Sequence, residues 1–493
     1  MKRYLTLLLS LLFVLPLPAQ SRREALLEYQ ARRRQAYTEF RDNYRKACAD
    51  FMRKRWEAFR AEAPVPVPER REPDIPVMKH PDAPSVPTQD RMPYDRVVDL
   101  PEPAPEMPDA PGIAETPVLP GKPAAGTDDA APAVDVSRPF KFTFYGTGCS
   151  VSLAAKHRFN LASVQENSVA NAWEGVSRGS YDAVAAECVA LKKALGLNDW
   201  GYYDLVRTLA DGFCGPKTNE SVVLQSFLMA EAGYKVRMAR GDGRLFLLLA
   251  TDGQVYARPY FNIDGQVFYI LDDVPRAASY NICNFTIPGE RPLSLAMPAP
   301  PLFAQKPAAP AVRNFDGVVS TTVTVNRNLM DFYTNYPPCH WGIYAATALT
   351  APVRGQLYPP LRAAVAGKGE REAAELLLHY LHRAFPYKTD EAQFGVERTL
   401  FAEEMYYYPY SDCEDRSILF ARLVKDLLGL DVVLLYYPAH IATAVCFKGE
   451  VKGDYMQLGN KRYVICDATY IGAGVGEAMP DLKRTPAQVV RID

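Results

Sequence analysis

Two stretches of this chain share one order of hydrophobic segments, a helix-like run followed by three strand-like runs. In the later stretch, CEDRSILFARLVKDLL ends at Gly429 and precedes the apolar runs LDVVLLYY, HIATAVCF and RYVICD. In the earlier stretch, KTNESVVLQSFLMAEA ends at Gly233 and precedes YKVRMA, RLFLLLA and VFYILDD. A glycine after an apolar-periodic run is typical of a helix end, and short β-branched runs are typical of strands. The pattern predicts a duplicated α+β domain, because periodicity outlasts identity in diverged copies.

The chain before these two copies has a different composition. Residues 21–62 contain twelve Lys or Arg against seven Asp or Glu, and aromatic side chains recur there at spacings near three or four. This pattern predicts an amphipathic helical arm over residues 20–62, which could pack on the folded body, self-associate or lie against a surface. Residues 63–137 contain eighteen prolines and are expected to form an extended polyproline-like linker. A shorter Pro-rich linker is expected at residues 297–312.

Globular domains are therefore expected at residues 138–296 and 313–493. A length of 493 residues agrees with two or three folded units, and 48% hydrophobic residues suffice for their cores. At the N-terminus, two basic residues and an apolar run that ends near small residues are typical of a secretory signal peptide over residues 1–19. We therefore expect an exported protein, in the bacterial periplasm or outside the cell, with no transmembrane span.

Charge and cysteine content narrow the classes of function. The net charge of −1 provides no field that would attract nucleic acid. Nine cysteines stand at wide spacings without a CxxC pair, so neither a disulfide framework nor a structural zinc site is predicted, and most should be small buried residues. The neighbouring Cys339 and His340 cannot easily converge on one ion. No metal and no cofactor is expected.

Cys413, His440 and Asp467 each lie at the end of a predicted element in the second copy. Cys413 should open a helix, whose unpaired N–H groups and dipole favour a thiolate. The adjacent carboxylates oppose a thiolate unless Asp412 and Asp415 cap that helix. His440 is the one histidine after Cys413, and Asp467 ends a later strand, where a carboxylate can orient an imidazole. Together they predict a Cys-His-Asp catalytic triad.

Each triad residue also has an ordinary structural reading. Cys413 could be a buried small side chain, His440 a sheet-edge histidine in a polar network, and Asp467 a turn residue after a strand. A zinc site made of these three is less favoured, because the set lacks a close ligand pair. Cys466 should point to the opposite sheet face and lie in the core, and Cys446 should also be buried.

The segments DCEDRS, YPAHIATAV and RYVICDATY resemble the catalytic core of the transglutaminase-like superfamily. The upstream FGVERTLFAEEMYYYPYSDCED is especially similar to the bacterial transglutaminase-like cysteine peptidases. The resemblance covers about residues 370–475 and, more weakly, 190–275. It implies a papain-like fold, in which the helix bearing the cysteine packs on an antiparallel sheet. It also implies Cys413 as nucleophile, His440 as base, Asp467 as the residue that orients the base, and a thioester acyl-enzyme resolved by water or an amine.

The family pattern also requires a side chain upstream of the nucleophile that stabilises the oxyanion. Gln393 is the candidate, with the backbone N–H of Cys413 as the second donor. Tyr408 and Tyr410 could take this role or line a pocket, although aromatic residues at such positions more often pack.

The first copy is predicted to be a degenerate, non-catalytic transglutaminase-like domain. When the two copies are aligned on their glycines, Lys217, Arg244 and Asp272 fall opposite the Cys, His and Asp of the triad. A domain that keeps only the aspartate lacks the thiol and the imidazole. It can still pack against the second domain, position it, or bind a ligand.

These observations predict an exported thiol hydrolase, a cysteine peptidase or amidase that acts on peptide-like amides. Its substrates would be peptides or proteins, with peptidoglycan peptides among the candidates. A non-enzymatic envelope scaffold or binding protein is the alternative from another class, because the first copy retains the pattern without the chemistry. Acyl transfer to amines, which would cross-link proteins, is a third hypothesis.

Overall fold

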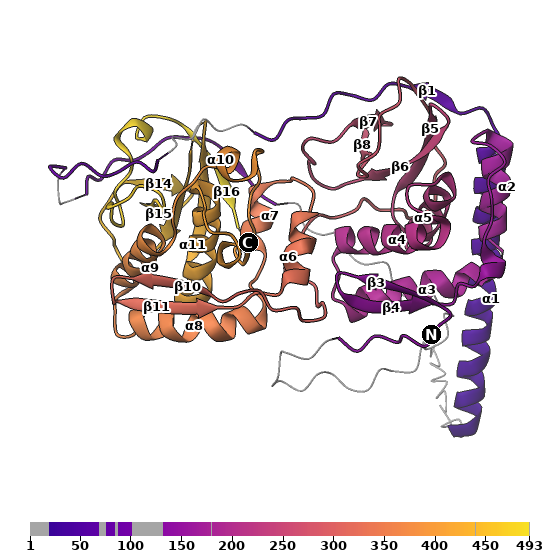
Figure 1. The fold of residues 1–493 in the computed structure, drawn as a ribbon, viewed down its shortest axis with the longest axis horizontal. Helices are drawn as coiled ribbons and strands as arrows, with labels where there is room; N and C mark the ends of the chain where they lie inside the picture. The colour runs from indigo at the N-terminus through magenta and orange to yellow at the C-terminus, as the bar shows by residue number, and fades with distance from the viewer. Residues whose placement is uncertain are drawn as a thin grey trace, which may run out of the picture.

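Two α+β domains lie side by side in the computed structural model, and the long helix α1 (Ala19–Met52) runs along the outer side of the first (Figure 1). The α+β class expected from the sequence is confirmed. The predicted signal peptide falls almost entirely outside the described part of the chain. No helix within that part is long and apolar enough to cross a membrane. The structure describes residues 19–68, 75–83, 87–100, 132–178, 180–438 and 440–492.

The second domain centres on helix α11 (Cys413–Leu428), which packs on strands β12 and β13 of a six-stranded sheet. The helix ends where predicted, because Gly429 adopts the left-handed φ of 63° and donates its N–H to the Lys425 carbonyl. Neighbouring strands are antiparallel except β16 and β2. In sheet order the strands are β14 (Tyr455–Leu458), β15 (Lys461–Cys466), β13 (His440–Cys446), β12 (Asp431–Tyr437), β16 (Ala487–Arg491) and β2 (Tyr94–Val98).

The other elements of this half cover the helical side of the sheet and its ends. The hairpin of β10 and β11 packs against helices α9 and α8, respectively. These elements are β10 (Ala311–Phe315), β11 (Val319–Val323), α6 (Arg327–Thr334), α7 (Trp341–Ala346), α8 (Ala351–Val365), α9 (Glu370–Ala384), α10 (Asp390–Phe394) and the short η2 (Glu404–Tyr406) and η3 (Pro480–Leu482).

The sheet of the first domain has the same strand order along the chain. Helix α5 (Asn219–Glu231) is followed by β5 (Val236–Gly241), β6 (Arg244–Ala250), β7 (Tyr260–Ile263), β8 (Gln266–Tyr269) and β9 (Tyr280–Cys283). Their spatial order, β7-β8-β6-β5-β9-β1, is that of β14-β15-β13-β12-β16-β2. The remaining elements are β1 (Glu57–Phe59), β3 (Phe140–Phe144), β4 (Thr147–Val151), η1 (Ala155–His157), α2 (Glu166–Val176), α3 (Ser180–Ala194) and α4 (Asp199–Cys214).

The Pro-rich segment is not a free linker where the structure describes it. Strand β2 lies in this segment and pairs with β16, so it completes one edge of the second sheet. Strand β1 lies before it, in the part of the expected helical arm that follows the end of α1 at Met52, and pairs with β9 at the edge of the first sheet. The helix predicted over residues 20–62 is therefore wrong for residues 57–59. Between the two strands, the Lys79 N–H donates to the Ile471 carbonyl at 2.9 Å and the Met92 N–H to the Tyr455 carbonyl at 2.8 Å. The tether expected over residues 63–137 is therefore wrong for residues 75–83 and 87–98. An open sheet edge offers hydrogen bonds to any extended chain, and proline is tolerated there.

The second Pro-rich segment, residues 297–312, is also packed against the protein. The Leu302 N–H donates to the Leu195 carbonyl at 2.8 Å, and Phe303 is 2% exposed. Phe303 packs against Phe144 of the first domain and Phe332 of the second, so the segment contacts both domains.

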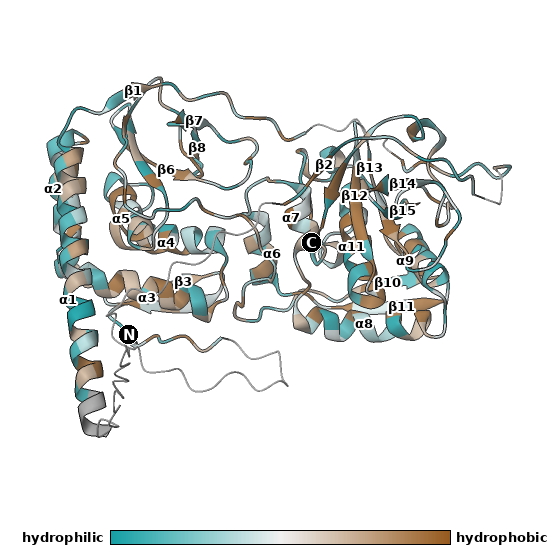
Figure 2. Ribbon diagram, turned by 180° about the vertical axis from the view of Figure 1, so that it is seen from behind, coloured by the Kyte–Doolittle hydropathy of each residue, from teal (hydrophilic) through white to brown (hydrophobic). Residues whose placement is uncertain are grey.

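The C-terminal part of α1 docks on the first domain, one of the three arrangements that the arm allowed. Arg45, 3% exposed, forms ion pairs with Glu231 of α5 and Asp182 of α3. The N-terminal part of α1 is mostly hydrophilic (Figure 2) but exposes Leu26 and Leu27. Self-association through residues 21–62 stays a prediction.

Candidate functional site

Cys413 is the first residue of α11 and lies against the start of β13. Its Sγ accepts the backbone N–H of Ile441 at 3.3 Å, and its thiol lies 3.6 Å from Oε2 of Glu414. Since Ile441 directly follows His440, the Cys413 thiol lies at the end of β13 that also carries the imidazole. Cys413 is 1% exposed, so the thiol is almost entirely covered.

His440 is held by Asp467, as the sequence predicts. Nε2 of His440 lies 2.8 Å from Oδ2 of Asp467. The other carboxylate oxygen accepts the N–H groups of Thr469 and Tyr470 at 2.9 and 3.1 Å. Burial opposes ionisation, but the charge and hydrogen bond of His440 and the bonds from Thr469 keep the pKa of Asp467 below its usual range. An ionised Asp467 directs Nε2–H toward itself, so Nδ1 is the nitrogen that can take a proton from a thiol.

His382 is a neighbour of this site that the sequence analysis missed. It lies on α9, is 7% exposed, and its Nε2–H donates to the backbone carbonyl of Asp467 at 2.9 Å. Burial lowers its pKa to about 4, so the ring is neutral at physiological pH. Its position within an amphipathic helical run did not indicate that His382 would contact Asp467.

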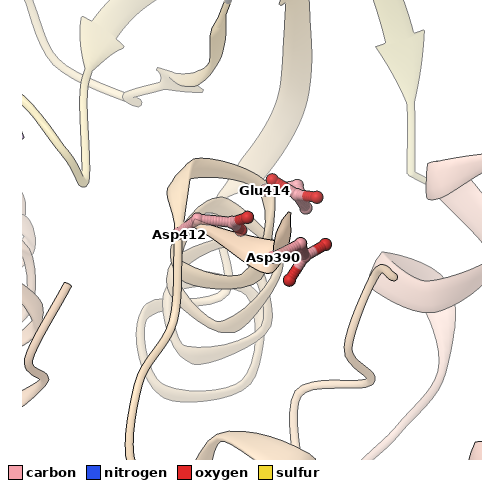
Figure 3. A group of neighbouring side chains, drawn as sticks. All are labelled: Asp390, Asp412 and Glu414. Atoms are coloured by element: carbon pink, nitrogen blue, oxygen red, sulfur yellow. The ribbon is translucent and has the colours of Figure 1, made fainter. Parts of the chain in front are cut away.

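Three buried carboxylates gather around the start of α11. Asp412 and Glu414 flank Cys413, and Asp390 reaches them from α10 (Figure 3). One oxygen from each lies within 4.8 Å of the others. Oxygen ligands of this kind suit Ca²⁺ or Mg²⁺ better than zinc. The fourth acidic side chain, Asp415, is occupied as a cap, because it accepts the N–H groups of Leu400 at 2.8 Å and Asp412 at 3.4 Å.

Without a cation, this cluster must retain protons. Burial, together with the negative charges of Glu414 and Asp415, raises the pKa of Asp390 to about 10. The carboxyl is therefore neutral in the folded protein at neutral pH, whereas in the unfolded chain it ionises near its ordinary value of about 3.9.

Asp390→Asn is expected to raise the melting temperature at alkaline pH and to change it little below about pH 4. The pKa of Asp390 is higher in the folded protein than in the unfolded chain. The protonated carboxyl therefore contributes to the free energy of unfolding at low pH, and this contribution falls by roughly 1 kcal/mol per pH unit as the pH rises toward 10. Asparagine mimics the protonated form and removes that loss. Thermal unfolding from pH 4 to 9 measures the effect, with the exposed neighbour change Glu391→Gln as control. A rise in the wild-type melting temperature on addition of CaCl₂ that Asp390→Asn abolishes would instead indicate a bound cation.

Gln393 lies on α10, one turn after Asp390. Its Nε2 donates to the Tyr410 carbonyl at 3.3 Å. Tyr408 stacks edge-to-face on Phe394 and packs under the guanidinium of Arg398. These contacts agree with a packing role for the tyrosine, and the oxyanion role of Gln393 stays a prediction.

The remaining cysteines behave mostly as expected. None of the nine cysteines, all of which lie within the described residues, forms a disulfide. Cys466 is buried in the core, whereas Cys446 is only half-buried. Cys339 is buried, and its neighbour His340 instead caps helix α7 by accepting the Gly342 N–H at 3.3 Å.

In the first domain, the positions that match Cys413 and His440 carry other side chains, whereas Asp272 keeps the aspartate. Arg244 and His440 each begin the second strand of the equivalent hairpin, as the alignment predicted. Lys217, however, lies before the N-cap of α5, so Asn219 is the first helical residue, as Cys413 is in α11. The correction arises because α5 has 13 residues and α11 has 16, so counting back from the glycine overshoots the helix start.

The fold thus brings Cys413, His440 and Asp467 together where β13 begins and β15 ends, with His382 and the acidic cluster beside them. An imidazole held by a carboxylate and a thiol at a helix N-terminus are the groups that acyl transfer through sulfur requires. Comparisons of this chain with models of known protein families, with curated proteins and with solved structures found no match.

Proposed function

We propose that this chain is an exported, transglutaminase-like thiol hydrolase that cleaves peptide-like amides through Cys413. The observation that carries the proposal is the 2.8 Å hydrogen bond between His440 and the buried Asp467. His440 begins β13, and the N–H of the next residue, Ile441, contacts the Cys413 thiol. A buried aspartate that orients an imidazole beside a helix-terminal thiol is what nucleophilic catalysis by cysteine requires.

In the proposed reaction, His440 accepts the thiol proton and the thiolate attacks the amide carbonyl. The backbone N–H of Cys413, with Gln393 as the candidate second donor, stabilises the oxyanion. His440 then gives its proton to the leaving amine, and a thioester remains on Cys413. Water, deprotonated by His440, releases the acid and restores the thiol. Asp467 stabilises the imidazolium in both halves of the cycle.

The architecture supports a papain-like assignment for the second domain. Helix α11, which bears the cysteine, packs on β12 and β13, and the histidine and aspartate come from β13 and the end of β15. The shared strand order of the two sheets supports the duplication, with a first domain that lacks a thiol and an imidazole at the matching positions.

One observation favours the alternative of a non-enzymatic envelope scaffold. Cys413 is 1% exposed and has Glu414 as a neighbour, and a carboxylate beside a thiol opposes formation of the thiolate. Acyl transfer to amines, the third hypothesis, uses the same acyl-enzyme and differs only in the acceptor.

Alkylation of the nine cysteines with iodoacetamide, followed by mass spectrometry of the peptides, tests the proposal. We expect Cys413 to react faster than Cys446 at pH 6 to 7, and His440→Gln to remove that advantage, because the imidazole generates the thiolate. Cys446 is an internal reference, since burial raises the pKa of its thiol. A Cys413 that reacts no faster than Cys446 at any pH would favour the scaffold.

A further inference from the structure

A cavity of about 380 Å³ lies between the two domains, away from the triad. The first domain contributes Trp200, Tyr256 and Arg258, and the second contributes Trp341 and Arg398. Neither Cys413 nor its two partners lines it. The volume is in the range of sites that bind small molecules and short peptides.

The aromatic walls of this cavity are held rigidly in place. Trp200 packs edge-on against Tyr336, with ring centroids 6.0 Å apart. The Tyr336 hydroxyl donates to the Leu295 carbonyl and accepts from Asn198 at 2.8 Å. Rings fixed in this way lose little conformational entropy when a ligand covers them.

Charged side chains of both signs line the cavity: Arg207, Arg258, Arg398, Asp273 and Glu397. The guanidinium of Arg207 is paired with Asp204 and Asp272, and that of Arg398 with Glu404. Arg258 is half-buried and lines the cavity, yet its side chain has no hydrogen bond or ion pair within the described residues. A partly desolvated guanidinium without a partner favours a bidentate carboxylate.

The loop that presents Arg258 is backbone-strained and is held from both sides. Ala257 has φ of 56°, a left-handed conformation that costs a non-glycine residue roughly 1 kcal/mol. The Ala257 N–H donates to the Val65 carbonyl at 2.7 Å, and the Tyr256 N–H donates across the domain boundary to the Pro338 carbonyl at 2.9 Å. These bonds maintain the conformation in which the side chains on either side of Ala257 line the cavity.

We propose that this cavity binds a short peptide through a carboxylate held by Arg258, with the aromatic walls covering its apolar part. The carboxylate is either the peptide C-terminus or an acidic side chain. The inference does not depend on catalysis by Cys413, because the two sites have no residue in common.

The test measures intrinsic tryptophan fluorescence of the mature chain carrying Cys413→Ala, which prevents turnover, since Trp200 and Trp341 line the cavity. Three probes distinguish the carboxylate source: acetyl-Ala-Ala-Ala with a free C-terminus, acetyl-Ala-Ala-Glu-amide and the neutral acetyl-Ala-Ala-Ala-amide. We expect one or both carboxylate probes to bind saturably and at least about 10-fold more tightly than the neutral amide, as a charge-assisted bidentate pair implies.

Arg258→Gln is expected to weaken binding of that probe about 10-fold or more, and Arg258→Lys to restore part of it. Arg276→Gln, a change of an exposed arginine outside the cavity, should leave binding unchanged. The proposal is overturned if no probe binds saturably, if the neutral amide binds equally well, or if Arg258→Gln binds like its parent. Loss of Cys413 reactivity in the alkylation experiment would not affect these outcomes.

Discussion

Cys413→Ala is expected to lower hydrolysis of p-nitrophenyl acetate or of a peptide amide by on the order of 10⁴-fold or more. The change removes the sulfur that is proposed to form the acyl bond, while His440 and Asp467 stay in place. Alanine is well tolerated at a helix start, and the lost contact from the Ile441 N–H to Sγ should cost only about 1 kcal/mol. Loss of activity without loss of fold is therefore the expected result.

The matched control is Cys446→Ala. Cys446 lies on β13, the strand that begins with His440, and is half-buried, so its replacement removes a thiol from the same sheet without touching the triad. It should retain the wild-type rate. A Cys413→Ala protein that keeps more than about a tenth of the activity would disprove the role of Cys413 as nucleophile. A tenfold lower rate corresponds to an activation free energy raised by only about 1.4 kcal/mol, far less than the loss of a nucleophile causes.

Gly453→Ala is expected to destabilise the protein by about 4 kcal/mol, seen as a lower denaturation midpoint. A Cβ at this position would lie less than 3.0 Å from the Cα of Gly476, and a backbone atom cannot move aside as a side-chain tip can. Gly453 also has φ of 147°, which L-residues rarely adopt. The contact joins the loop before β14 to the loop after Asp467, where the Asp454 N–H donates to the Gly476 carbonyl at 2.8 Å.

Gly449→Ala, four residues earlier, separates this effect from the general cost of losing a glycine. A Cβ there has no atom within 4 Å, and its φ is not left-handed. Its effect should stay within about 0.5 kcal/mol. Equal midpoints for the two variants in urea unfolding would show that the close approach to Gly476 does not limit stability.

Local pattern was sufficient for the elements that carry the site. The amphipathic run before Gly429 and the apolar runs after it are α11, β12, β13 and β15, and the matching runs of the first copy are α5, β5, β6 and β8. Helix period, strand alternation and a C-terminal glycine are signals within about fifteen residues of sequence. They can therefore be recognised without knowing which elements pack together.

Contacts between distant parts of the chain were not predictable in the same way. Strand β2 lies in a segment whose prolines argue against any sheet, and strand β1 lies in the expected helical arm. Both form because two sheet edges elsewhere accept their backbone bonds. Asp390 joins Asp412 and Glu414 from a different helix, and His382 reaches the Asp467 carbonyl from α9. None of these pairings has a characteristic sequence spacing.

The sequence by itself therefore determined the α+β class, the repeated helix and strand order, and three reactive residues placed at element ends. Only the tertiary structure decided that β1 and β2 complete the two sheets, that buried carboxylates surround the thiol, and that an arginine without a partner faces a cavity between the domains. Secondary structure follows from neighbours along the chain. Burial, pKa and cavities follow from neighbours in space, which packing alone selects.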